Sequence, residues 1–179
     1  ALLIWSGTLA TAGQTLKVTG ALAVTQSEQM VLTTSADSVD VGGLFTTNSI
    51  TSSTGGLTAG TLVLRNSFTQ TSGSGLNFAA SGTHRTVFAG GTAQAALFAS
   101  PGATSSHFQD VVFADPAGVT FGSDAAVNGT ATVASGQVAA PIRALTIGTG
   151  LVDAGHGWHP DTTVFTGNSA VLPDSMTGS

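Results

Sequence analysis

The chain has 179 residues, and only 7% of them are charged: four Lys or Arg against nine Asp or Glu, for a net charge of −5. About a quarter of an ordinary soluble domain is charged, so Ser, Thr and Gly take over much of the polar surface. The four basic residues are scattered, which argues against nucleic acid as a partner. No apolar run approaches the roughly 20 residues of a spanning helix, so we expect no membrane insertion. The chain has no Cys, which excludes disulfides and zinc–thiolate sites.

Helix-forming residues are scarce, and a 23-residue repeat dominates the sequence. Steps of 23 residues from Thr15 meet a polar residue each time. Three positions after each of these residues, an apolar residue occurs in five of six places. A fixed period of this length is typical of stacked repeats. We therefore predict an all-β fold: a single-stranded parallel β-helix, or β-solenoid, with about 23 residues per coil. The polar column is Thr15, Ser38, Thr61, His84, His107 and Thr130; the second column is Val18, Val41, Leu64, Val87, Asp110 and Val133.

In chain order, residues 1–14 are expected to end a preceding coil or to cap the stack, with Leu9 pointing inward. Residues 15–150 hold the coils, each beginning after a small, polar corner suited to a tight turn. Alternation along each strand predicts one face inside and one in water. Two further inward columns are Leu16, Val39 and Leu62, and Leu22, Phe45 and Phe68; the outward column is Lys17, Asp40, Val63, Thr86, Gln109 and Thr132.

The register drifts from Arg85 onward. Arg85 falls in an inward column and Asp110 interrupts another, so we predict a one-residue bulge at each place, which would turn the charge outward. Residues 151–179 have more loop character and are expected to form an irregular final coil and a C-terminal tail.

Four segments resemble the "V-x-G-T-L-x-V-x-x-G" coils of large bacterial surface and secreted proteins of the autotransporter-passenger and filamentous-haemagglutinin type. The resemblance implies a right-handed parallel β-helix outside the cell, acting as a stalk, adhesin or matrix component. We expect no membrane barrel or secretion domain of the full pattern within these 179 residues. The segments are VTGALAV (18–24), TVFAGGTAQ (86–94), VFADPAGVTF (112–121) and VNGTATVASGQV (127–138).

Two groups of histidines are candidate metal ligands. His156, His159 and Asp161 surround Trp158 in a Gly- and Pro-containing loop, and two His with a carboxylate suit zinc or another divalent ion. The plainer interpretation is a polar loop whose Trp158 covers the last coil. His84 and His107 lie one period apart and are expected to stack, either as a metal or pH-sensitive pair or only as hydrogen-bonded turn residues.

Thr46, Thr69 and Thr92 fall in one column of the 23-residue repeat. A column of threonines is also a feature of the flat hydroxyl faces of ice-binding solenoids. With Trp158 they are the candidate ligand-binding residues. Carboxylates for glycosidic chemistry must lie about 5–9.5 Å apart; Asp110, Asp115 and Asp124 could approach one another, but each is more simply a turn or bulge residue.

We therefore expect a non-enzymatic extracellular structural module of a bacterial surface or secreted protein, with no catalytic residues and no cofactor. Its open strand edges predict self-association or neighbouring repeats of a longer chain, and a carbohydrate or other cell-surface ligand is possible. The alternatives are a carbohydrate-binding or carbohydrate-cleaving β-helix and an ice-binding solenoid.

Overall fold

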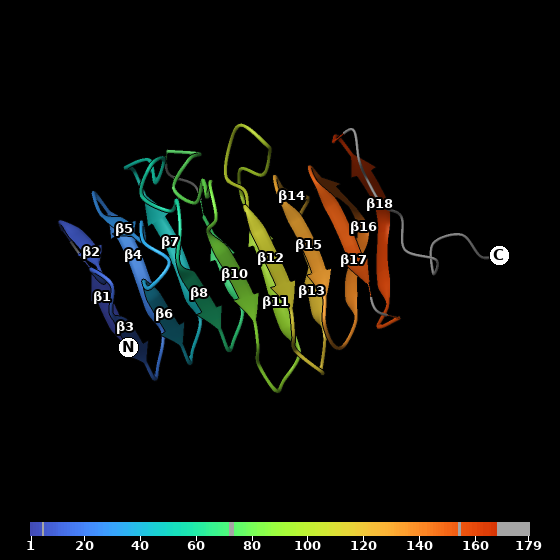
Figure 1. The fold of residues 1–179 in the computed structure, drawn as a ribbon, viewed down its shortest axis with the longest axis horizontal. Helices are drawn as coiled ribbons and strands as arrows, with labels where there is room; N and C mark the ends of the chain where they lie inside the picture. Colours follow the sequence, from blue (N-terminus) through green and yellow to red (C-terminus); the bar gives the residue numbers. More distant parts are fainter. Residues whose placement is uncertain (5, 72–73, 154, 168–179) are drawn as a thin grey trace.

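The computed structural model describes residues 1–4, 6–71, 74–153 and 155–167 and forms a parallel β-solenoid of about seven turns (Figure 1). The described residues contain no helix, as predicted. Strands near the N-terminus lie at one end of the rod and β17 and β18 at the other. Each coil runs along three sides in the same order, and its strands pair in parallel with strands of the neighbouring coils.

The first side is a seven-stranded parallel sheet in the order β17-β15-β12-β10-β8-β6-β3. Its strands follow the predicted alternation, with every second side chain inside. They are β3 (Thr15–Val18), β6 (Ser38–Val41), β8 (Thr61–Leu64), β10 (Arg85–Phe88), β12 (Asp110–Phe113), β15 (Thr130–Val133) and β17 (Gly150–Asp153). The last of these strands lies in the segment expected to be irregular.

The second side is the path β1-β4-β7-β9-β11-β13-β16 of the nine-stranded sheet. The long strands β16 (Val138–Ile147) and β18 (Trp158–Phe165) pair with each other over both halves, with a register shift between Ala140 and Ala144. The remaining strands here are β1 (Leu2–Ile4), β4 (Leu22–Gln26), β7 (Phe45–Ser49), β9 (Phe68–Gln70), β11 (Gln94–Phe98) and β13 (Val119–Phe121).

The third side has little regular strand in the middle of the rod. It consists of β2 (Thr8–Ala10) with β5 (Gln29–Val31) at one end, and β14 (Ala125–Val127) with the second halves of β16 and β18 at the other. Between them the side continues through single bridges. These bridges are Leu32 with Leu57, Ala79 with His107, and Phe108 with Val127.

The predicted columns are confirmed over the first three full coils. Val18, Val41 and Leu64 stack in register and are buried. The other two inward columns pair as predicted, through Leu16, Val39 and Leu62, and through Leu22, Phe45 and Phe68.

The register beyond the third coil differs from the prediction, because the period is not constant. Arg85 pairs with Thr61 after 24 residues and Asp110 with Arg85 after 25, while Gly150 follows Thr130 after only 20. The added residues lie in the connections, so neither charge needs a bulge and both stay outside. The predicted inward Val87 is therefore wrong, since Phe88 continues the column of Leu64; Thr86, expected outside, is fully buried beside Leu62.

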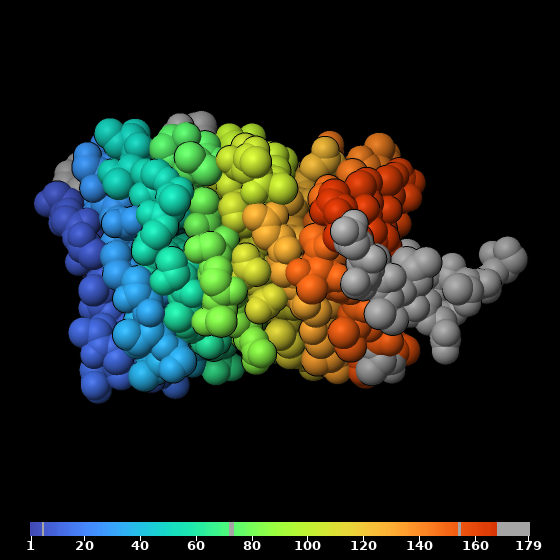
Figure 2. Space-filling view, turned by 45° about the horizontal axis from the view of Figure 1, so that its top comes forward, coloured from blue at the N-terminus to red at the C-terminus, as the bar shows by residue number. Residues whose placement is uncertain are grey.

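The longest connections gather at the corner between the second and third sides. Phe68 pairs with Ala96, 28 residues later, and the loops of the middle coils rise together at the top of Figure 1. We call residues 50–56, 74–76 and 99–105 the loop crest. In Figure 2 the teal, green and yellow-green surfaces of these coils adjoin.

Phenylalanine fills the interior of the middle coils. Phe68 is fully buried, and its ring centroid lies 4.9 Å from those of Phe78 and Phe98 and 5.2 Å from that of Phe108. Aromatic rings at such distances pack favourably beyond the area they bury. The longer coils thus enclose a wider interior that large side chains occupy.

Candidate functional site

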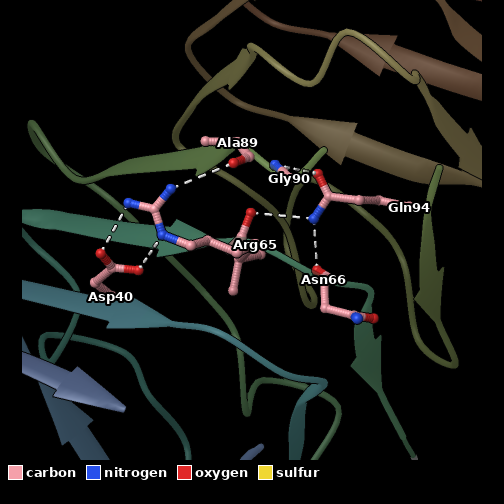
Figure 3. A network of polar contacts seen from close by, with 7 residues as sticks. Asp40, Arg65, Asn66, Ala89, Gly90 and Gln94 are labelled. Atoms are coloured by element: carbon pink, nitrogen blue, oxygen red, sulfur yellow. Dashed lines mark hydrogen bonds and ion pairs between the residues drawn. The ribbon is translucent and has the colours of Figure 1, made fainter. Parts of the chain in front are cut away.

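An ion pair joins two neighbouring coils at the seven-stranded sheet. Arg65, just after β8, forms a two-pronged ion pair with Asp40 on β6, with Nε to Oδ1 at 2.8 Å and Nη2 to Oδ2 at 2.9 Å (Figure 3). The hydrogen bonds from Arg65 hold the pKa of Asp40 below its ordinary value. Such an exposed pair fixes neighbouring coils relative to each other but contributes about 1 kcal/mol at most.

A buried amide supports the corner between the first and second sides. The Nε2 of Gln94 donates to the carbonyl oxygens of Leu64, at 3.0 Å, and Asn66, at 2.7 Å, and its Oε1 accepts from the N–H of Gly90 (Figure 3). The side chain thus satisfies backbone groups of two coils where the chain turns. The 23-residue step places Gln94 in one polar column with Thr25, Asn48 and Thr71, which predicts a polar strand face and not this buried contact with two coils.

Asp37 is a buried carboxylate at the corner that precedes β6. Its Oδ1 accepts from Thr11 Oγ1 at 2.7 Å and Gly13 N at 2.6 Å in the coil before, and its Oδ2 from Thr33 N at 2.7 Å and Thr34 N at 2.8 Å. These four hydrogen bonds, that from Thr11 first, hold the pKa of Asp37 far below its ordinary value. The carboxylate therefore joins two coils.

The next coil has room at this corner only for a glycine. Gly60 adopts a φ of +72°, and a Cβ there would lie 2.6 Å from the carbonyl oxygen of Asp37. Both the left-handed conformation and the close approach exclude larger residues.

The other candidate carboxylates bind backbone groups at separate corners. Asp110 accepts from Thr130 N at 2.9 Å, Asp115 from Ala117 N at 2.9 Å and Asp124 from Ala144 N at 3.0 Å. They lie at three different corners of a coil: Asp110 is the first residue of β12, Asp115 follows β12, and Asp124 precedes β14. Their observed partners are those of turn residues.

The prediction that His84 and His107 stack is wrong. His107 bridges Ala79, whereas the His84 carbonyl oxygen accepts from the N–H of Asp110 at 3.1 Å, because the inserted residues shift the register. His84 Nδ1 lies 2.9 Å from the Ala59 carbonyl oxygen, and burial lowers the pKa of His84. The Nδ1 and Nε2 of His107 lie 2.7 and 2.8 Å from the carbonyl oxygens of Ser105 and Ala80.

The C-terminal candidates divide between the interior and the surface. Trp158 is buried opposite Val138, its Nε1 donates to Thr163 Oγ1 at 2.9 Å, and its ring packs against Phe113. It therefore covers the last coil and does not line a groove. His156, His159 and Asp161 are exposed. Among all the residues that the structure describes, no three His, Asp or Glu side chains come together as a metal site.

The predicted threonine column holds for two coils only. Thr46 and Thr69 are neighbours in register, but the next position is Leu97 on β11, and Thr92 lies in the turn before that strand. The five residues added between β9 and β11, relative to a 23-residue step, move Thr92 out of the column. The outer surface of the second side is thus not a regular hydroxyl array.

A polar network inside the solenoid supports the loop crest, and sequence reasoning missed it. Gln70 Nε2 donates to Asn77 Oδ1 at 2.8 Å, Asn77 Nδ2 donates to the Ser49 carbonyl oxygen at 3.1 Å, and Ser106 Oγ donates to that of Gly75 at 3.0 Å. Thr47 Oγ1 donates to the Asn77 carbonyl oxygen at 3.0 Å. Polar residues at inward strand positions, such as Thr47 and Gln70, were the available signal.

One inward hydroxyl has no such partner, and we expect its removal to stabilise the protein. Thr86 Oγ1 is buried without a hydrogen bond among the described residues, so Thr86→Val should raise the free energy of unfolding by about 1 kcal/mol. The matched change Thr47→Val, which removes a hydrogen bond, should lower it by about 1–2 kcal/mol. Urea unfolding measures both; equal signs for the two variants would contradict the assignment.

Comparison with known proteins adds no relative: no family model, curated protein or solved structure matches the chain. Within the described ranges there is also no helix long and apolar enough to cross a membrane.

Proposed function

We propose that this chain is a non-enzymatic structural module that stacks end to end, as part of a stalk, adhesin or filament on or outside a bacterial cell. The observation that carries the proposal is the open N-terminal end of the stack. Strands β1, β2 and β3 begin their sheets or lie at their edge, and each leaves one row of backbone N–H and C=O groups without a strand partner in the described chain. Such edges pair readily with further strands.

The side chains at this end support the same proposal. Leu2, Ile4, Leu9 and Leu16 point into the solenoid from three sides and remain partly exposed, whereas their equivalents one coil further, such as Leu22 and Val39, are buried. A further coil or a second copy, placed on this end in the same parallel register, would bury them. The resemblance of the repeats to coils of bacterial surface and secreted proteins supports a location outside the cell.

Concentration-dependent assembly tests the proposal. Sedimentation velocity and negative-stain electron microscopy of the wild-type chain should give rods that lengthen along the solenoid axis. Leu9→Lys, which places a charge on the open end, should keep the rods short, and Leu97→Lys, on the side of the rod, should not. As a control, circular dichroism should show the same β-sheet spectrum for both variants and the wild type.

Isolated rods at every concentration would contradict end-to-end stacking. Specific binding in a glycan array, together with isolated rods, would instead favour the carbohydrate-binding alternative.

A further inference from the structure

A small cavity lies inside the solenoid beneath the loop crest, between the second and third sides. It has a volume of about 10 Å³ for the centre of a water molecule, which is the size needed to hold one water. Its polar lining comes from five residues, Glu28, Gln29, Thr47, Ser53 and Asn77, and five apolar side chains complete the wall.

Glu28 has an incomplete set of hydrogen bonds at this cavity. The residue is 1% exposed, and its Oε2 accepts from the N–H of Thr25 at 2.6 Å. Its Oε1 is buried and has no hydrogen-bond partner among the described residues. A buried carboxyl oxygen left in this state is costly, so a donor at this point would stabilise the fold.

The polar neighbours in the wall donate hydrogen bonds to backbone carbonyl oxygens. Thr47 Oγ1 donates to the Asn77 carbonyl oxygen and Ser53 Oγ to that of Leu76, both at 3.0 Å. Asn77 Nδ2 donates to the carbonyl oxygens of Ser49 and Thr71. Gln29 Nε2 donates to the Ser52 carbonyl oxygen at 3.2 Å, and Ser53 Oγ accepts from the N–H of Ala79 at 2.6 Å. Each of the two hydroxyl oxygens keeps at least one lone pair that can accept a further hydrogen bond. Glu28 Oε1 and these hydroxyl oxygens can therefore accept hydrogen bonds from a molecule in the cavity.

We propose that this cavity binds one ordered water molecule, which donates one hydrogen to Glu28 Oε1 and the other to the hydroxyl oxygen of Thr47 or Ser53. A water with two or more polar partners in a site of this size is a regular part of a protein interior. A divalent cation is disfavoured, because calcium needs six to eight oxygen ligands and half of this wall is apolar. The inference does not depend on the proposed function.

A crystal structure that resolves ordered water tests the proposal directly. The expected result is a peak about 2.7–3.2 Å from Glu28 Oε1 and from one of the two hydroxyl oxygens. A dry cavity would overturn the proposal. So would a peak with six or more oxygen neighbours at about 2.3–2.6 Å, which indicates a cation.

Magnetic relaxation dispersion of water provides a test in solution, because it counts long-lived internal waters. Glu28→Met, which fills the site with an apolar side chain, should reduce the count by one relative to the wild type. Asp161→Asn, a change at an exposed carboxylate, should leave it unchanged. Retention of the water in a folded Glu28→Met variant would overturn the assignment; should that variant fail to fold, the wild-type crystal structure decides.

Discussion

Replacing Phe68 by alanine is expected to lower the free energy of unfolding by about 3–5 kcal/mol, the usual cost of a fully buried phenylalanine. Phe68 lies at the centre of the aromatic interior, stacks on Phe45 at 5.8 Å between ring centroids, and touches three further rings. Its neighbours are held by strands on either side, so the cavity could close only in part. Guanidinium unfolding followed by circular dichroism measures the loss.

Leu97→Ala is the matched control for Phe68→Ala. Leu97 lies on β11 in the coil that pairs with β9, but its side chain is on the outside and 39% exposed. We expect a change within about 0.5 kcal/mol, as for most surface substitutions. Similar losses for the two variants would contradict the position of Phe68 at the centre of the packing.

Replacing Asp37 is the second change with a large expected effect. Asp37→Ala removes four hydrogen bonds at once and leaves the buried hydroxyl of Thr11 and the half-buried N–H of Gly13 without their acceptor. Because coils of a solenoid are stabilised mainly by their neighbours, the loss should concentrate in the first two coils. Hydrogen exchange should show faster exchange in residues 6–41 and little change beyond β12.

The same carboxylate predicts sensitivity to acid. The pKa of Asp37 is lowered on folding from its ordinary value of 3.8, so its contribution to stability is fully present above that value. It is lost as the pH falls below about 4 toward the lower folded value. Thermal unfolding between pH 6 and pH 2 should therefore show a smaller drop for Asp37→Asn, which cannot titrate, than for the wild type.

Asp161→Asn is the control for this titration, since Asp161 is an exposed residue on β18. Its pH dependence should match that of the wild type. If Asp37→Asn follows the same curve as well, the hydrogen bonds at the corner do not favour the charged carboxylate.

The early coils could be predicted from the sequence because they have equal length. Between Thr15 and Leu64 a 23-residue step reproduces the observed register, so Val18, Val41 and Leu64 could be placed in one column. A residue inserted in a connection shows in the sequence only as a shift in the register of the residues that follow it. The same drift would follow from a bulge at Arg85 or from one residue added to the connection before it. The structure has the added residue, which places Thr86 beside Leu62 and Phe88 beside Leu64.

The candidate site was less predictable because its polar contacts join different coils. Asp37 meets Thr11, 26 residues away, and Asn77 meets Ser49, 28 residues away, and neither separation equals the period. Two predictions are wrong because they extend the 23-residue period past the first insertion. They are the pairing of His84 with His107 and the threonine column that ends at Thr92.

The even spacing of partners along the rod has a consequence for the speed of folding. Paired strands are mostly 19–28 residues apart in a chain of 179 residues, which corresponds to a relative contact order of about 0.13. Two-state proteins with that value are mixed α/β domains, whereas β-sandwiches of similar stability have about 0.16–0.22 and fold more slowly. Each coil closes on its neighbour through a short loop and then serves as a template for the next coil, so we expect the chain to fold at a rate between those of helical bundles and β-sandwiches.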